Sequence, residues 1–352
     1  MASAKAPTTQ KVSEVVMTFR PARHFLPGDN KSHVTSVDFD DSGELAILAR
    51  SDDTLQIYNC KEGKWAKELK SQKYGVHLAR YTHHAQSIVY ASTKIDHNLR
   101  YLSAHDNTYL RYFKGHTDRV TCLALCPAND TFLSCSLDNT VRLWSVQSSS
   151  FTAKINLTRP TLAAYDPSAS VIAIASPSTH CVLLYDLRNY DKPPFATFDL
   201  LEHDRAYNNS ATNWSKLEFS NDGKSLVVGT AGRGHFVLDA FDGELKHFCQ
   251  RDSTSERAAP GQAPAGASVE TQGDMCIAPD GRYVIGGAGN GYNDLLVWDI
   301  HKESSPDRIL MPESVLPGKE KAEIVAYNQR NNLICTADRD FYLWQPDPEF
   351  AP

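Results

Sequence analysis

The sequence predicts an all-β fold: one ring of seven repeated, four-stranded units. Units of similar shape recur along all 352 residues, and runs rich in β-branched and aromatic residues alternate with turns containing Asp, Asn or Gly. Each unit closes on an aromatic or aliphatic residue, and successive closing positions lie 43, 43, 41, 53, 60 and 46 residues apart. These closing residues are Tyr58, Tyr101, Trp144, Tyr185, Leu238, Trp298 and Trp344. A period of about 40–45 residues with Gly-His early and Trp-Asp late is the signature of a WD40 β-propeller blade.

The N-terminus precedes the first unit. Residues 1–14 are predicted to be a disordered tail, because they are rich in Ala, Ser and Thr and have no apolar core. Residues 15–19 (VVMTF) are apolar but belong to no unit of their own. An open sheet edge invites aggregation. We therefore predict that 15–19 form the outermost strand of the last blade and close the ring.

The third unit is the clearest. It begins at Gly115-His116 and ends at Leu143-Trp144, whereas the second unit, which closes at Tyr101, is weaker. In this unit the positions typical of a buried polar network are occupied by His116, Ser134, Asp138 and Trp144. A network of this kind is tolerated in a core only when each member has a partner, and it then fixes one geometry.

Two of the spacings are long enough to require insertions. Residues 201–212 are polar and resemble no strand, and residues 251–268 contain the Ala-, Pro- and Gly-rich run 258–267. Both are predicted to be flexible. The propeller is expected to span 15–345, with 346–352 as a short C-terminal tail.

Composition excludes several classes of function. The net charge is −6 and no run of five basic residues occurs, so direct nucleic-acid binding is not expected. No stretch approaches the ~20 apolar residues that a membrane helix needs. The eight cysteines are scattered, which predicts reduced thiols in the cytosol or nucleus.

No catalytic or metal-binding pattern stands out. The thirteen histidines show neither His-x-Glu nor His-Glu-x-x-His spacing, and there is no Gly-x-Ser-x-Gly elbow. The glycine-rich runs 229–234 and 286–291 resemble phosphate loops, but each joins two predicted strands and is interpreted as a hairpin turn. We expect no catalytic residue, no cofactor and no metal, and hence a protein that is not an enzyme.

Several runs are more specific than blade geometry requires. They include 73–76 (KYGV), 100–116 (RYLSAHDNTYLRYFKGH), 129–134 (NDTFLS), 194–198 (PFATF), 216–224 (KLEFSNDGK) and 239–243 (DAFDG). Through these runs the chain resembles the family of the small WD-repeat subunit of COMPASS, the complex that methylates lysine four of histone H3. The resemblance extends from about Val15 to Trp344 and departs in the two insertions.

The resemblance implies a non-catalytic nuclear scaffold, monomeric within larger complexes and associated with chromatin. It would dock a peptide segment of the Set-domain methyltransferase subunit beside other COMPASS subunits, and so link the complex to RNA polymerase II. It also implies a second assembly. In fungi the family is shared with the cleavage and polyadenylation factor, and in animals with a protein-phosphatase-one nuclear complex, which implies a role in transcription termination and mRNA 3′-end processing.

Peptides usually meet a propeller at the mouth of its central channel. The mouth is lined by the loops that enter the innermost strands and by the middle hairpin turns of the blades. On that face we expect the partner-binding side chains of Lys31, Asp96, Arg119, Arg159, Arg233 and Arg339. Ordinary solvated loop charges explain each of these residues equally well.

Three other functions stay open at this stage. A WD-repeat adaptor of another pathway, such as a ubiquitin-ligase substrate receptor, would share the fold without the family-specific runs. An enzyme could use the channel, although no metal or nucleophile motif supports it. A direct reader of histone tails would need an aromatic cage, which the sequence does not show.

Overall fold

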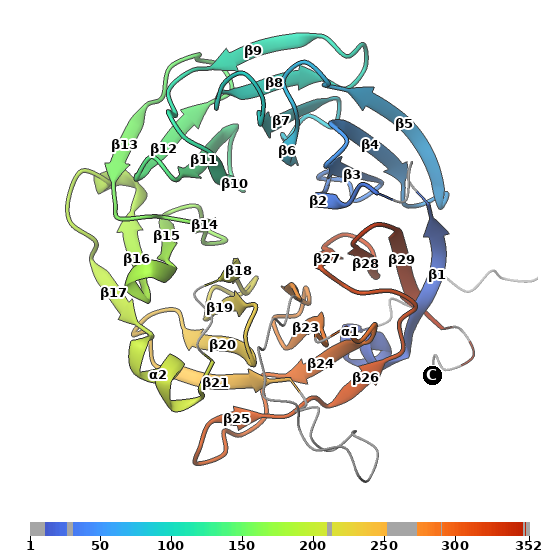
Figure 1. The fold of residues 1–352 in the computed structure, drawn as a ribbon. Helices are drawn as coiled ribbons and strands as arrows, with labels where there is room; N and C mark the ends of the chain where they lie inside the picture. The colour runs from blue at the N-terminus through green and yellow to red at the C-terminus, as the bar shows by residue number, and fades with distance from the viewer. Residues whose placement is uncertain are drawn as a thin grey trace, which may run out of the picture.

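The chain forms a closed ring of seven β-sheets, described here from a computed structural model. The structure describes residues 11–26, 31–209, 213–251, 273–289, 291–347 and 349. Figure 1 shows the sheets arranged as blades around a central channel. The predicted all-β, seven-bladed propeller is therefore confirmed.

The first four blades each contain four consecutive antiparallel strands, ordered from the channel outward. Blade 1 contains β2 (Val34–Phe39), β3 (Leu45–Arg50), β4 (Thr54–Asn59) and β5 (Lys64–Lys70). Blade 2 contains β6 (His77–Tyr81), β7 (Ser87–Ala91), β8 (Leu99–Ser103) and β9 (Tyr109–Phe113). Blade 3 contains β10 (Val120–Leu125), β11 (Thr131–Ser136), β12 (Thr140–Ser145) and β13 (Ala153–Asn156). Blade 4 contains β14 (Leu162–Tyr165), β15 (Val171–Ser176), β16 (Cys181–Asp186) and β17 (Ala196–Asp199), with two 3-10 turns, η2 (Pro177–Thr179) and η3 (Leu187–Asn189).

The last three blades depart from this pattern. Blade 5 contains β18 (Trp214–Phe219), β19 (Ser225–Thr230), β20 (Gly234–Asp239) and β21 (Leu245–Gln250), and the short β25 (Ile309–Leu310) adds to it in parallel. Blade 6 contains β22 (Met275–Ile277), β23 (Tyr283–Gly287), β24 (Leu295–Asp299) and β26 (Ser314–Leu316). Blade 7 contains β27 (Ile324–Asn328), β28 (Leu333–Ala337), β29 (Phe341–Pro346) and β1 (Phe19–Phe25).

The N-terminal segment closes the ring, but with different boundaries from those predicted. The outermost strand of blade 7 is β1, which pairs antiparallel with β29 from Phe19↔Pro346 to Phe25↔Phe341. The predicted strand 15–19 is wrong over 15–18, because these residues lie in the helix α1 (Val12–Val15) and the 3-10 turn η1 (Val16–Thr18). The predicted disordered tail is likewise wrong from residue 12 onward, and residues 1–10 lie outside the described part.

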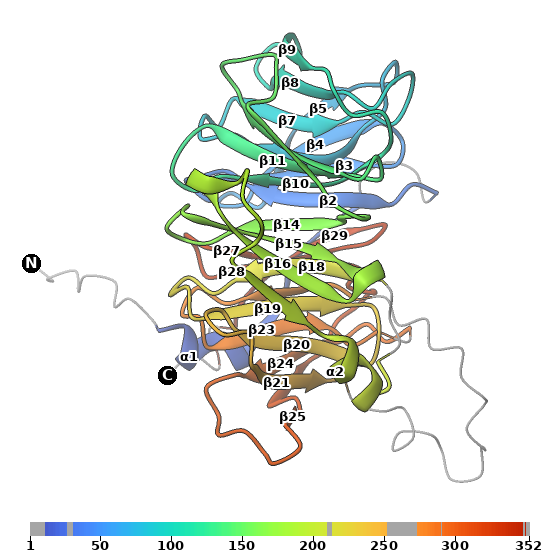
Figure 2. The same ribbon diagram turned by 90° about the vertical axis from the view of Figure 1, so that its left-hand side faces the viewer.

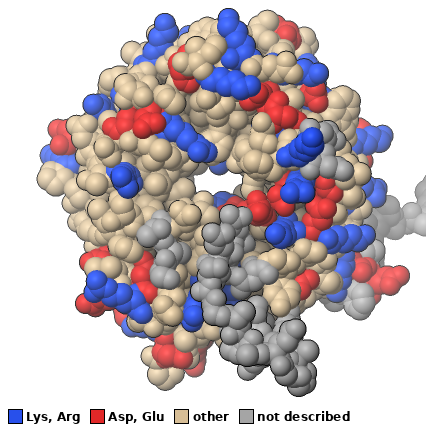
Figure 3. Space-filling model, in the orientation of Figure 1, with Lys and Arg blue, Asp and Glu red and all other residues tan. Residues whose placement is uncertain are grey.

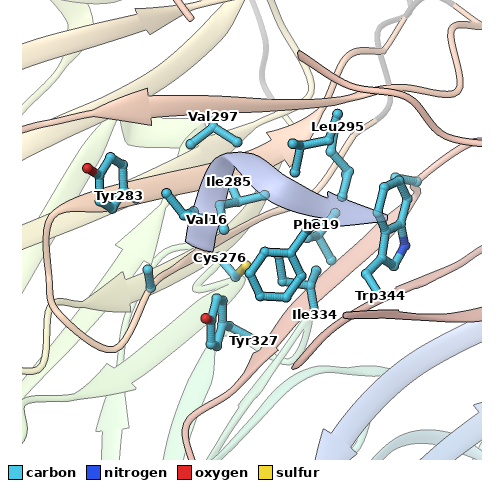
Figure 4. Packing of buried hydrophobic residues seen from close by; sticks show 14 of the residues in the cluster. Val16, Phe19, Cys276, Tyr283, Ile285, Leu295, Val297, Tyr327, Ile334 and Trp344 are labelled. Carbon is cyan, nitrogen blue, oxygen red and sulfur yellow. The ribbon is translucent and has the colours of Figure 1, made fainter. Parts of the chain in front are cut away.

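Helical periodicity explains this correction. Val12, Val15, Val16 and Phe19 are spaced i, i+3, i+4 and i+7, which places them on one side of a helix. Val15, Val16 and Phe19 are fully buried in the core between blades 6 and 7. In Figure 4, Val16 and Phe19 lie among residues of both blades, including Ile285, Tyr327 and Trp344.

Of the two insertions predicted to be flexible, one is corrected in part and the other lies almost wholly outside the described residues. Residues 201–206 are not flexible but form the helix α2 (Leu201–Ala206), whose Asp204 is buried and bonded to His180, with 2.7 Å between Asp204 Oδ2 and His180 Nδ1. Of the insertion 251–268, only the buried Arg251 is described. Figure 2 shows α1 and α2 on opposite faces of the ring. Within the described residues no helix is long and apolar enough to cross a membrane.

The closing residues of the units are core residues, with one exception. Six of the seven are buried, but Tyr101 is only half-buried and its neighbour Leu102 takes the buried position. Leu102 pairs with Ile88 as Trp144 pairs with Phe132. Because a shift of one residue moves a strand side chain to the other face, the second unit closes at Leu102.

Candidate functional site: the channel mouth and the seam of blades 7 and 1

Blade 3 contains the polar network that the sequence pointed to, and the structure brings all four residues together. His116 Nδ1 lies 2.8 Å from Asp138 Oδ2, and His116 Nε2 lies 2.6 Å from Ser134 Oγ. Trp144 donates its indole N–H to the same Ser134 oxygen over 2.8 Å. Since ionised Asp138 only accepts, Nδ1 carries the proton of a neutral imidazole and Nε2 accepts from the serine hydroxyl.

Burial and hydrogen bonds shift the pKa values of the two titratable residues of this network, His116 and Asp138. Burial lowers the pKa of His116 against the opposing effect of Asp138, which favours the neutral ring. Burial by itself raises the pKa of Asp138, but hydrogen bonds from Thr140 and His116 outweigh it and the net pKa is lowered. Every member is therefore partnered in the protonation state that suits it.

The network also positions a loop at the channel mouth. Thr117 N–H donates to Asp138 Oδ2 over 3.1 Å, and the Ser136 hydroxyl donates to the Asp118 carbonyl over 2.9 Å. The backbone carbonyl of the next residue, Arg119, accepts a hydrogen bond from Leu137 N–H over 3.0 Å. The interior of blade 3 thus fixes the backbone that presents Arg119 to solvent.

The six predicted partner-binding residues share one face of the ring by topology. In an antiparallel blade, the loop entering the first strand and the turn joining the second and third strands lie at the same end. Lys31, Arg119 and Arg159 occupy entering loops, and Asp96, Arg233 and Arg339 occupy second-to-third-strand turns. Figure 1 looks onto this face, the one on which α2 lies.

Five of these six side chains are exposed to solvent, and the sixth is half-buried in an ion pair. Lys31, Arg119, Arg159, Arg233 and Arg339 are exposed. Asp96 is half-buried, and its two carboxylate oxygens accept from Arg100 over 2.9 and 3.1 Å. Burial raises the pKa of Asp96, but the bonds from Arg100 reverse this and hold it below its usual value. The geometry thus assigns Asp96 to the fold of blade 2 rather than to a docking surface.

A charged hollow of ≈ 660 Å³ opens on this face at the seam where blade 7 meets blade 1. Four segments line it: the loop before β2, the turn between β23 and β24, the loop before β27, and the turn between β28 and β29. Its residues are Lys31, His33, Asn293, Lys319, Glu320, Lys321, Glu323, Asp338 and Arg339. We call it the seam hollow.

The seam hollow contains only two of the residues expected from the sequence, Lys31 and Arg339. Sequence reasoning missed residues 319–323, although a signal was available. The run Lys319-Glu320-Lys321-Ala322-Glu323 directly precedes an innermost strand, as the segments carrying Lys31 and Arg119 do. Conversely, Arg119, Arg159 and Arg233 do not line the hollow and are spread over other blades.

The basic side chains of the hollow are not held in ion pairs within the described part of the chain. Among the described residues, Lys31, Lys319, Lys321 and Arg339 form no ion pair with an acidic side chain. Burial, and then repulsion from Asp338, raise the pKa of Glu323, and burial followed by Asp340 raises the pKa of Glu320. Figure 3 shows acidic and basic side chains gathered beside the channel mouth. Such a polar surface suits a charged polypeptide and not an apolar small molecule.

Charged groups on the innermost strands have a structural role. Lys216 Nζ donates to the Val325 carbonyl over 2.9 Å and lies 3.7 Å from Asp274 and 3.8 Å from Glu218. These residues come from blades 5, 6 and 7 or their entering loops, so the cluster ties three blades together. Within the described residues, no group of three or more His, Cys, Asp or Glu side chains is placed to hold a metal ion.

The fold is that of a WD-repeat β-propeller, with charged side chains around one mouth of its channel. A WD domain, G-beta repeat model matches residues 21–59 and 107–145. The chain is 32% identical over 339 residues to "WD repeat-containing protein 82" of Drosophila melanogaster, covering 96% of this chain and 98% of that protein. It is 34% identical over 337 residues to "COMPASS component SWD2" of Saccharomyces cerevisiae (94% and 96% covered). It is 38% identical over 283 residues to "Set1 complex component swd2" of Schizosaccharomyces pombe (79% and 75%). The chain belongs to the family of Swd2 and WD repeat-containing protein 82.

Proposed function

We propose that this protein is a non-catalytic scaffold subunit of a nuclear COMPASS-type histone H3 lysine methyltransferase complex. It docks a segment of the methyltransferase subunit and so links methylation to transcription by RNA polymerase II. Two of the relatives carry the names of the Set1 complex and of COMPASS, which supports the assignment to such a complex.

The observation that carries the docking role is the seam hollow. It combines crowded carboxylates with cations that form no ion pair among the described residues, so a segment with both charge signs would relieve both. The hollow's walls come from three blades, so a bound segment would also bridge the junction of blades 7 and 1.

Affinity purification of the tagged full chain from nuclei tests the assignment, with stoichiometry read by mass spectrometry. We expect a Set-domain methyltransferase and its companion subunits in near-equal amounts. Additional recovery of 3′-end-processing or phosphatase subunits would show that the second assembly implied by the family resemblance also forms. Recovery of some other complex, a ubiquitin ligase for example, with no methyltransferase would overturn the proposal.

A further inference from the structure

The outer edges of the blades are not equivalent. A strand at the end of a sheet exposes unpaired backbone groups, and proteins guard such edges with charges, proline, short strands or covering segments. Charged residues make up more than half of β5, and β1 contains Pro21 and a register shift. β21 is covered by β25, β26 has three residues and packs against η1, and β13 and β17 have four residues each.

Strand β9 of blade 2 is the least guarded of these edges. It has five residues, Tyr109 to Phe113, of which only Arg111 is charged, and a register shift at Leu110 is its one other protective feature. Leu110 and Tyr112 are 50% and 38% exposed. β9 ends its sheet, and no strand of the described chain pairs with its outer side, as its position on the rim in Figure 1 shows.

An aromatic shelf adjoins this edge. The ring of Tyr109 lies 5.5 Å from that of Tyr74 and 5.5 Å from that of Tyr112, between centroids. The guanidinium carbon of Arg100 lies 3.7 Å from the Tyr74 centroid and 5.4 Å from the Tyr112 centroid. Tyrosine and arginine are the residues that most often anchor protein interfaces.

The shelf is held in place from beneath. Arg100 is locked by its paired bonds to Asp96, and the Tyr109 hydroxyl lies 3.1 Å from that of Tyr90 and 3.3 Å from that of Ser71. Because these groups are already fixed, a partner would not have to order them.

The charge around β9 is positive. Lys73 Nζ lies 5.1 Å from the centroid of Tyr74, and Arg111 and Lys114 lie within and just after β9. None of these three cations forms an ion pair in the described structure. Two nearby acids are neutralised by ion pairs, Asp96 with Arg100 and Asp53 with Lys94, and the third, Asp106, accepts only from the hydroxyl of Thr108, so the cations stay in excess.

We infer that β9 is a second docking edge, on which an acidic, extended segment of a partner protein adds as a fifth strand of blade 2. Its backbone pairs with the outer side of β9, and its carboxylates on the face of Arg111 meet that guanidinium, whereas Lys73 lies beside Tyr74 on the other face. In this mode main-chain hydrogen bonds supply affinity and alternate side chains supply specificity. The chain already uses strand addition on blade 5, where β25 pairs with β21 through Phe248↔Ile309 and Cys249↔Leu310. This edge lies on a different blade from the seam hollow and does not depend on the function proposed above.

A synthetic peptide of alternating Glu and Val, labelled with fluorescein, tests the inference by fluorescence anisotropy with the full chain. Alternating Lys and Val, and alternating phosphoserine and Val, are the comparison peptides. Two further Glu-Val peptides carry N-methyl groups on all Glu or on all Val residues. Only one set of alternate N–H groups can face β9, so we expect one N-methylated peptide to lose binding and the other to keep it.

Variants locate the binding. Arg111→Glu and Leu110→Glu should each weaken binding of the Glu-Val peptide about tenfold. The matched control, Lys154→Glu on β13, and the seam-hollow variant Lys31→Glu/Arg339→Glu should leave binding unchanged. The inference is overturned if the Lys-Val peptide binds equally well, if only the phosphoserine peptide binds, if both N-methylated peptides keep their affinity, or if neither β9 variant weakens binding.

Discussion

Blade 3 and the seam between blades 7 and 1 use polar residues in opposite ways. In blade 3, His116, Ser134, Asp138 and Trp144 face one another and satisfy one another's hydrogen bonds. At the seam, Lys31 and Arg339 have no acidic partner and Glu323 is held among other carboxylates. The difference separates two settings within one ring: the inward polar groups of blade 3 fix the blade, and the exposed charges at the seam are the ones we propose to meet a partner.

The packing of the N-terminal segment that closes the ring is expected to show the largest single-residue effect on stability. Phe19→Ala removes a fully buried ring from the core that joins blades 6 and 7 and should lower the free energy of unfolding by about 4 kcal/mol. Urea denaturation followed by fluorescence measures this change. Phe195→Ala is the matched control, because Phe195 is 59% exposed and its loss should cost little. Equal stability of the two variants would show that the N-terminal segment does not close the ring.

Breaking the blade 3 network should cost slightly less. Asp138→Ala leaves His116 Nδ1, Thr117 N–H and Thr140 without their acceptor and should lower the free energy of unfolding by about 3 kcal/mol. Asp191→Ala, at an exposed site, is the control. A loss no larger than that of the control would mean that the network does not stabilise the blade.

An acid at the junction of blades 1 and 2, where Asp38 of β2 accepts from Tyr81 N–H of β6, should make stability depend on pH. Burial raises the pKa of Asp38 on β2 from 3.8 to about 6, despite Arg80 and the hydrogen bond from Tyr81 N–H. The unfolded chain releases this proton first as pH rises, so Asp38 costs nothing below pH 3.8 and its full penalty applies above about pH 6.

Asp38→Asn should remove this penalty while an amide oxygen keeps the bond from Tyr81 N–H. At neutral pH we expect a gain of about 1–2 kcal/mol, after allowing for partial exposure, and little change near pH 4. Thermal unfolding of both proteins across this pH range measures the difference. A gain that is the same at both ends of the range would contradict the raised pKa.

The sequence predicted the interior of the blades better than the charged face at the channel mouth. The blades and the residues of the blade 3 network were predictable because the repeat imposes spacing on them. Residues 15–19 were wrongly predicted to be a strand because the run VVMTF is apolar enough for either a buried strand or a buried helix. Only the helical spacing of these residues with Val12 distinguishes the two. Tyr101 was predicted to close the second unit in place of Leu102, because two adjacent apolar residues do not show which of them faces the core.

The docking face was less predictable because it is assembled across blades. Loop position alone put Lys31, Arg119, Arg159, Arg233 and Arg339 on one face, but not which of them share a hollow. Asp96 appeared to be a free loop acid until Arg100, four residues on and across a hairpin, was seen to engage both its oxygens. Pairing of this kind depends on tertiary contacts, which sequence spacing does not encode.

The smallest effect on stability, and the largest on function, is expected at the seam hollow. Lys31→Glu/Lys319→Glu/Arg339→Glu reverses three exposed, unpaired charges and should change the free energy of unfolding by no more than about 0.5 kcal/mol. A control of equal charge change is Lys154→Glu/Arg188→Glu/Lys192→Glu, also at exposed positions.

The most direct test of the scaffold function is to purify the two variants and the unchanged chain in parallel from nuclei and to quantify the methyltransferase subunit recovered with each. We predict near-stoichiometric methyltransferase with the unchanged chain and the control, and a loss of at least about tenfold with the seam-hollow variant at unaltered thermal stability. Equal recovery with all three proteins would contradict docking at the seam.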